Sequence, residues 1–149
     1  MDKTPAEIID RFFIETGIIH QLTSAMIENH LPGRMSSTQF GLIGHLARRP
    51  AGETPLQLAR AFQVPKTTMT HMIAGLEKLG FISLHANPSD ARSKIVQATP
   101  HGITFLQEKT SAVMEENADL IQAIGLDAFA AAVPHLERIR EALDSARDT

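Results

Sequence analysis

The stretch that decides the fold is residues 54–94, TPLQLARAFQVPKTTMTHMIAGLEKLGFISLHANPSDARSK. It contains two amphipathic segments, 54–62 and 67–79, which are separated by a four-residue turn at 63–66. The clearest apolar stripe lies in the second segment, and a polar, turn-rich loop follows it. Two helices joined by such a turn and followed by a hairpin have the order of a winged helix-turn-helix. The stretch therefore predicts a lobe that binds DNA.

The starts and stops of the helices are marked by hydroxyl residues and glycines. Thr4, Ser36 and Thr54 each stand three positions before Glu or Gln, as in a capping box, and Thr99-Pro100 opens a further helix. The expected helix stops are Gly33, Gly52, Gly80 and Gly125.

The wing is predicted because the spacing of the apolar residues changes from helical to alternating after the second helix of the motif. Residues 81–86 and 94–99 alternate as two short strands, and residues 87–93 form a hairpin loop between them. A long helix is then expected from about Pro100 to Ile124.

The two ends of the chain carry more apolar positions than a single protomer needs to bury. The last segment repeats apolar residues with the spacing of a coiled-coil seam, and Pro134 predicts a kink or a restart near Val133. These faces could pack within one protomer, but we favour an intertwined homodimer.

Together these patterns predict a mainly α fold with a small β-hairpin wing. The expected parts are an N-terminal dimerisation helix at 1–34, a winged helix-turn-helix lobe at 35–101 and C-terminal dimerisation helices at 102–149, in one compact fold.

The charge of the chain is unevenly distributed along its length. Residues 35–101 hold seven Lys or Arg and three acids, which gives +4, whereas the flanks hold seven bases and fourteen acids, which gives −7. The sum is the net charge of −3. A basic centre between acidic ends suggests a unit that binds a polyanion, here double-stranded DNA, although uneven surface charge alone would give the same pattern.

The candidate DNA contacts lie on the second helix of the motif and on the wing. Small polar side chains can reach base edges without blocking entry to the major groove, and a basic hairpin suits phosphate or the minor groove. The recognition-helix candidates, opposite its apolar stripe, are Lys66, Thr67, Thr68, Thr70 and His71. The wing candidates are Arg92, Ser93 and Lys94, with Asp90 placed to orient Arg92 or to brace the turn. Ser36 and Ser37 are further candidates for phosphate contact.

Nearly the whole chain resembles the MarR family of bacterial transcription regulators. The resemblance rests on residues 54–60, 66–70 and 76–82, and most specifically on the wing sequence Asp-Ala-Arg-Ser-Lys at 90–94 with Thr-Pro-His-Gly at 99–102. It implies a homodimer formed through the terminal helices, which binds a pseudo-palindromic operator as a repressor. It also implies release of DNA by a small, often aromatic or phenolic, ligand held between the lobe and the dimerisation helices.

Two positions depart from the family pattern. His71 stands where members often carry Arg, and Gly75 lies near a position that is often basic. We expect ordinary folding, a shifted operator sequence and weaker, more salt-sensitive binding, and the His71 side chain makes pH-dependent binding a further hypothesis.

The effector pocket is expected at the junction of the first, second and fifth helices. The candidate ligand-binding residues are Phe13, His20, Phe40 and His45, for each of which core packing is the alternative interpretation.

Several other classes of protein are disfavoured by the sequence. The chain has no cysteine, which excludes thiol redox sensing, and it shows no phosphate loop, nucleophile elbow or paired catalytic carboxylates, so no enzyme and no cofactor are expected. No metal site is expected, although a mixed His and carboxylate site across helices stays open. No signal peptide or membrane span is evident, which predicts a cytoplasmic protein. The alternative function is a winged-helix dimer that acts through protein contact or ligand sequestration and binds DNA weakly.

Overall fold

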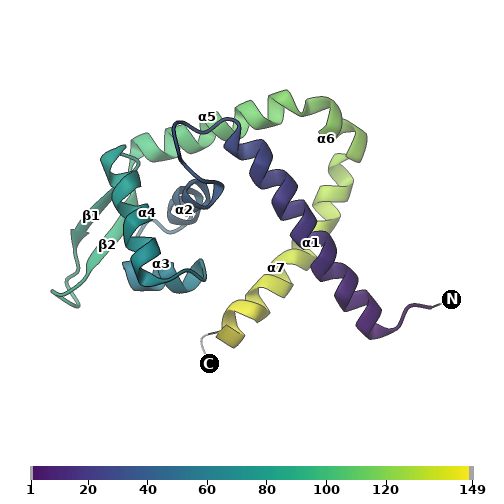
Figure 1. Ribbon diagram of the computed structural model, residues 1–149, viewed down its shortest axis with the longest axis horizontal. Coiled ribbons are helices and arrows are strands. Elements are labelled where there is room, and N and C mark those ends of the chain that lie inside the picture. Colours follow the sequence, from purple (N-terminus) through teal and green to yellow (C-terminus); the bar gives the residue numbers. More distant parts are fainter. Residues whose placement is uncertain (1, 148–149) are drawn as a thin grey trace.

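The computed structural model describes residues 2–147, which form helices and one β-hairpin (Figure 1). In chain order the elements are α1 (Pro5–Glu28), α2 (Ser37–Ala47), α3 (Pro55–Ala61), α4 (Lys66–Lys78), β1 (Ile82–Ala86), β2 (Lys94–Ala98), α5 (Pro100–Glu116), α6 (Ala118–Ile124) and α7 (Leu126–Arg147). β1 and β2 pair in antiparallel register, from Ile82 opposite Ala98 to Ala86 opposite Lys94. The mainly α winged-helix fold is confirmed.

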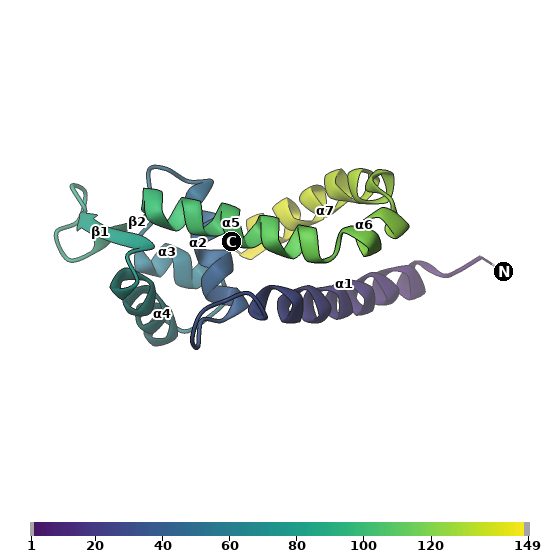
Figure 2. The ribbon, with the colours of Figure 1, turned by 90° about the horizontal axis from the view of Figure 1, so that it is seen from above.

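The buried core lies entirely in the lobe formed by α2, α3, α4, the hairpin and the first turns of α5. The largest fully buried side chains are Leu42, Ile43, Leu46, Leu58, Met69, Leu76, Ile82 and Val96. In Figures 1 and 2 this lobe occupies one end of the molecule, α1 and α6 extend away from it, and α7 turns back so that its C-terminal end reaches α3. None of these three helices contains a buried residue.

The predicted helix starts are confirmed by their hydrogen bonds. Thr4, Ser36 and Thr54 each form the reciprocal capping box, and the Thr99 side chain accepts from the backbone N–H of Gly102. Because these caps satisfy backbone N–H groups that have no partner within the helix, the local sequence marks where these four helices begin.

The predicted stops are correct as helix ends at Gly80 and Gly125, which follow α4 and α6, but only as turns at Gly33 and Gly52. Gly33, Gly52, Gly80 and Gly125 all adopt positive φ. However, α1 already ends at Glu28 and α2 at Ala47, so irregular chain separates those helices from Gly33 and Gly52.

The C-terminal region corrects two expectations. The single helix expected from Pro100 to Ile124 is interrupted at Asn117, where the backbone (φ −107°, ψ 19°) leaves helical geometry and the side-chain amide donates to the Val113 carbonyl at 2.8 Å. This competition from a short polar side chain is typical of Asn inside helices. Conversely, α7 runs through Pro134 without the restart that the proline suggested. No helix within residues 2–147 is long and apolar enough to cross a membrane.

Candidate nucleic-acid interface

The α4 helix separates its apolar and polar residues cleanly. Met69, Met72, Ile73 and Leu76 are buried in the lobe. All five recognition-helix candidates are exposed on the opposite side: Lys66, Thr67, Thr68, Thr70 and His71. The Thr70 hydroxyl donates to the Lys66 carbonyl at 2.9 Å, so its oxygen retains lone pairs that can accept a further hydrogen bond.

The turn before α4 is held by backbone contacts to α3. Gln63 adopts a left-handed φ of 54°, and its side chain donates to the Arg60 carbonyl at 2.8 Å. The Val64 N–H donates to the Ala59 carbonyl at 3.1 Å. These bonds fix the relative orientation of the two helices of the motif, and so the direction in which the exposed face of α4 points.

The wing loop holds Arg92 close to Asp90. One oxygen of the Asp90 carboxylate accepts from the backbone N–H of Arg92 at 2.9 Å and from its guanidinium Nε at 3.2 Å. Asp90 thus contacts both the turn backbone and the arginine side chain, and its part in orienting Arg92 toward DNA stays a prediction. The Arg92 side chain is 91% exposed, which leaves the rest of its guanidinium open to solvent. Ser93 is instead turned inward and accepts from the Asn87 side chain at 2.8 Å.

An isolated β-bridge, which the sequence patterns did not indicate, attaches the wing to the lobe. Glu53 pairs with Val96 of β2 through two backbone hydrogen bonds of 3.1 and 2.8 Å. Gly52 precedes it with φ +80°, and a Cβ there would lie 2.5 Å from the Val96 carbonyl oxygen. A single bridging residue has no periodicity, so only Gly52 carried a signal, and that was interpreted as a helix stop.

The Glu53 side chain also organises a small polar cluster beside this bridge. Its Oε1 lies 3.1 Å from His45 Nε2 and 2.7 Å from Arg49 Nε. The His45 ring packs edge-on against Phe62, with centroids 5.3 Å apart. Burial lowers the pKa of His45, and this effect outweighs the opposing influence of the Glu53 carboxylate.

The candidate phosphate contacts at the start of α2 are already engaged within the chain. The Ser36 hydroxyl accepts from the Gln39 N–H at 3.1 Å, and the Ser37 N–H donates to the Glu28 carboxylate at 3.0 Å. An acidic side chain thus lies at the helix N-terminus where a phosphate was expected. Phosphate contact by these serines stays a prediction.

Gly75 does not lie among the exposed residues of α4. It is half-buried, and a Cβ at this position would lie 3.2 Å from the Gln39 side-chain nitrogen. The glycine therefore serves the close approach of α4 to the start of α2. Of the two positions that depart from the family pattern, His71 is therefore the one that faces solvent.

The four candidate ligand-binding residues do not share one site. Phe13 and His20 are exposed on α1, whereas Phe40 is buried and packs edge-on against Phe105 of α5, with centroids 6.1 Å apart. His45 alone lines the large cavity between α7 and the lobe. Ligand binding by this set stays a prediction. Within residues 2–147 no group of three or more His, Cys, Asp or Glu is arranged to hold a metal ion.

Comparison with known proteins identifies the lobe. Residues 35–93, which include α2, α3, α4, β1 and the whole wing loop, match the model of the MarR family. The match to the MarR family model thus covers the lobe up to the end of the wing loop.

The whole chain has the fold of MarR-family regulators. A solved structure of MarR is 23% identical and covers 99% of this chain and 97% of its own, with a TM-score of 0.74. A mutant MarR from E. coli complexed with operator DNA is 19% identical, with coverage of 92% and 99% and a TM-score of 0.66. The transcriptional regulator BldR from Sulfolobus solfataricus is 18% identical, with coverage of 91% and 99% and a TM-score of 0.67. These likenesses show the fold of the chain, and BldR is by its name a transcriptional regulator.

Proposed function

We propose that this MarR-family protein is a cytoplasmic, homodimeric transcriptional repressor that binds a pseudo-palindromic operator. The observation that carries the proposal is the exposed polar face at the start of α4, flanked by an exposed arginine on the wing of the same lobe. A helix with small polar side chains enters the major groove, and a cation beyond it reaches the backbone or minor groove. The E. coli MarR mutant of similar fold that is complexed with operator DNA supports the proposal of DNA binding.

The proposed role of each residue in DNA binding follows from the chemistry of its side chain. Lys66 and Arg92 supply charge that attracts phosphate, and Thr67, Thr68, Thr70 and His71 face the base edges. Asp90 restricts Arg92 to one direction, which lowers the conformational entropy that DNA binding would cost.

The proposed dimer uses the apolar surfaces that the protomer leaves uncovered. The large hydrophobic side chains exposed on α1 are Ile8, Ile9, Phe13, Ile14, Ile18, Ile19 and Leu22, and α7 adds Leu126, Phe129, Val133, Leu136 and Leu143. Monomeric proteins rarely expose such continuous apolar surface. A second copy of this chain would cover it and place two α4 helices about one DNA turn, roughly 34 Å, apart. Residues 1–34 and 102–149 would then serve dimerisation, and residues 35–101 would bind DNA.

Release by a ligand is the remaining part of the proposal. A ligand that binds one spacing of the two lobes better than the other would shift the dimer away from the spacing that fits the operator. Only this difference in affinity is required, so a modest movement of the lobes suffices.

The test is a fluorescence-anisotropy titration with labelled DNA from immediately upstream of the gene. Wild type, Arg92→Ala and the control Arg138→Ala, which removes the same charge from the exposed face of α7, are compared at about 50 and 200 mM salt. We expect Arg92→Ala to weaken binding and to reduce the salt slope by about 1, while the control behaves as wild type.

If the protein binds this duplex no more tightly than a duplex of scrambled sequence, the next experiment is the selection of binding sites from random DNA. A stable dimer that selects no sequence there would contradict the proposal and favour the sequestration or protein-contact function.

A further inference from the structure

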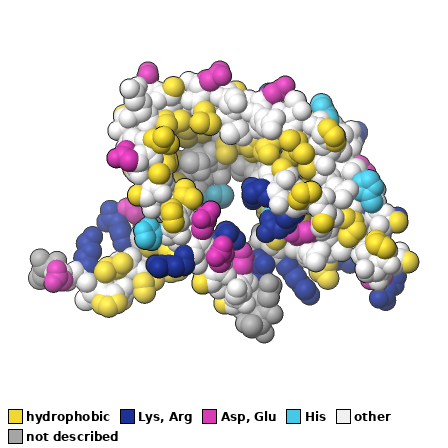
Figure 3. Space-filling model, turned by 180° about the vertical axis from the view of Figure 1, so that it is seen from behind, with side chains coloured by type: hydrophobic (Ala, Val, Ile, Leu, Met, Phe, Trp, Pro, Cys, Tyr) yellow, Lys and Arg dark blue, Asp and Glu magenta, His cyan; other side chains and the backbone are white. Residues whose placement is uncertain are grey.

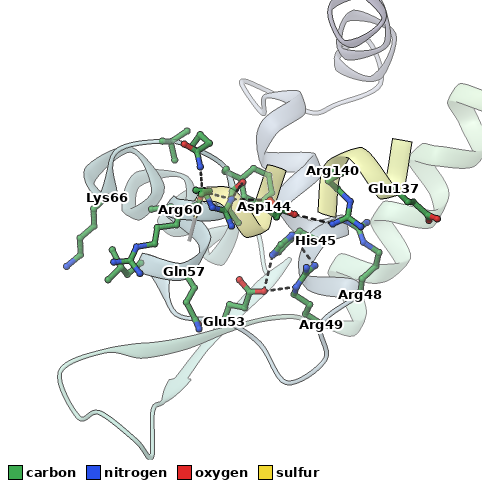
Figure 4. Close-up of a pocket in the computed structure, with 17 residues that line it drawn as sticks. His45, Arg48, Arg49, Glu53, Gln57, Arg60, Lys66, Glu137, Arg140 and Asp144 are labelled. Atoms are coloured by element: carbon green, nitrogen blue, oxygen red, sulfur yellow. Dashed lines mark hydrogen bonds and ion pairs between the residues drawn. The ribbon is translucent and has the colours of Figure 1, made fainter. Parts of the chain in front are cut away.

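A cavity of about 1400 Å³ lies between the lobe and the C-terminal half of α7 (Figure 4). Its walls come from the end of α2, the loop that follows, α3 with the turn after it, and α7. The last described residue of α7, Arg147, closes one end by donating to the Arg60 carbonyl at 3.0 Å. The space-filling view also shows a hollowed face, where apolar side chains lie along one rim and Lys and Arg side chains lie beside the hollow (Figure 3).

The cavity is strongly basic although the chain as a whole is acidic. Its lining includes six Lys or Arg and three Asp or Glu, an excess of three positive charges in a chain whose net charge is −3. The cations are Arg48, Arg49, Arg60, Lys66, Arg140 and Arg147, and the acids are Glu53, Glu137 and Asp144.

The acids compensate only part of this charge. Arg49 pairs with Glu53 at 2.7 Å, and Arg140 and Arg147 share Asp144 at 3.1 and 3.3 Å. Arg48 forms no ion pair with any residue of the 2–147 range. Figure 4 shows it extending toward Arg140 from the opposite wall. Asp144 and Glu141 (3.4 Å) offset part of the charge of Arg140, and an anion between the two guanidinium groups would remove the repulsion that remains.

The remainder of the lining suits the carbon skeleton of an organic molecule. Leu56, Phe62 and Val64 contribute apolar surface, and His45 lies half-buried beside them. Guanidinium groups form paired hydrogen bonds with carboxylates and phosphates, so a ligand that carries several such groups would pair with the arginines that line the cavity.

We propose that this cavity binds a small organic polyanion, a polycarboxylate or a phosphate ester, which Arg48 of the lobe and Arg140 of α7 hold from opposite sides. This inference deepens the proposed function, because it names the class of effector and a site distinct from the expected junction of α1, α2 and α5. Since the ligand contacts both the lobe and a helix of the proposed dimer, its binding ties the position of the lobe to α7.

The site is tested by isothermal titration calorimetry of the full chain without DNA, so that the result does not depend on operator binding. Citrate and inorganic pyrophosphate are the probes, and sodium chloride at matched ionic strength is the blank. We expect binding by wild type and a loss of at least about tenfold in affinity for Arg48→Gln and for Arg140→Gln. The matched control is Arg138→Gln, which removes the same charge from α7 outside the cavity and should bind as wild type. Circular dichroism checks that each variant is folded.

The two probes separate the two sources of the anion. Binding of citrate alone assigns the site to polycarboxylates, binding of pyrophosphate alone assigns it to phosphates, and either result supports the proposal. Absence of binding by both, or an equal loss in Arg138→Gln, overturns it. A loss of DNA affinity in Arg48→Gln in anion-free buffer, not seen in Arg138→Gln, would also overturn it by assigning the cavity to the DNA backbone.

Discussion

At the scale of single residues, Thr99 and Gly102 form the junction between the wing and α5. The Thr99 hydroxyl donates to the Gly80 carbonyl at 2.6 Å and accepts from the Gly102 N–H at 3.0 Å. Gly102 lies against the Phe81 backbone so closely that a Cβ would overlap its carbonyl oxygen. The Thr-Pro-His-Gly sequence is thus required by a close approach of two backbone segments.

This contact predicts the effect of Gly102→Ala. Because the obstructing atoms belong to the backbone, relief requires a shift of β1 or α5, and we expect a loss of about 1–3 kcal/mol in the free energy of unfolding. The control is Gly41→Ala on the exposed side of α2, where the new methyl group has only ordinary contact with Phe62 and improves helix propensity by up to about 1 kcal/mol. Urea unfolding monitored by circular dichroism measures both. Equal stability of the two variants would contradict the prediction.

His45 predicts a dependence of stability on pH. Its pKa in the folded protein is below the value of 6.5 expected for the unfolded chain, because burial disfavours the imidazolium. Below pH 6.5 the unfolded chain therefore binds a proton at His45 more readily than the folded protein does. The free energy of unfolding falls as the pH decreases from this value, and it stops falling once the pH is below the pKa of His45 in the folded protein.

The measurement compares wild type with His45→Gln in urea unfolding between about pH 7.5 and 5. Glutamine keeps a polar side chain near Glu53 but cannot titrate in this range. We expect the variant to lose less stability on acidification than wild type, and identical pH profiles would show that His45 does not contribute.

At the scale of elements, the α1 helix differs from every helix of the lobe because it buries none of its residues. Leu22 is 61% exposed, so Leu22→Glu costs an isolated protomer little but would place an unpaired charge in a dimer interface. We expect a shift from dimer to monomer in sedimentation equilibrium with unchanged helix content. Gln21→Glu adds the same charge at an adjacent polar position and should remain dimeric. A dimeric Leu22→Glu variant would exclude this part of α1 from the interface.

The elements that could be predicted from sequence are those determined by local chemistry. Capping residues fixed the starts of α1, α2, α3 and α5, and period-2 alternation located both strands to within a residue. The break at Asn117 is not predicted because the apolar pattern continues across it. Of the two outcomes expected at Pro134, a kink or a restart, the restart does not occur.

Features that depend on tertiary contact had no comparable signal. The Glu53 bridge joins the wing through backbone atoms, and the basic cavity forms only because Arg48 and Arg140, which are 92 residues apart, face each other. The exposed recognition face, by contrast, could be predicted because the apolar stripe on α4 determines which side is buried.

At the scale of the whole molecule, all fully buried side chains among residues 2–147 belong to the lobe, while the apolar side chains of the terminal helices remain largely exposed. Stability of the lobe therefore depends on its own core, whereas the arrangement of α1, α6 and α7 in the proposed dimer depends on the partner copy. This division allows the lobe to move as a body without losing its internal packing.

The interruption at Asn117 has a mechanical consequence for such movement. It leaves α5 as a separate rod of 17 residues, about 25 Å long, with its first turn locked to the wing through Gly102. A rotation of about 5° at the Asn117 end would swing the wing end by about 2 Å, which exceeds the tolerance of a hydrogen bond to a base edge. In the proposed DNA complex this rod would act as a lever arm, so that a small hinge motion at Asn117 would be amplified into loss of register on the DNA.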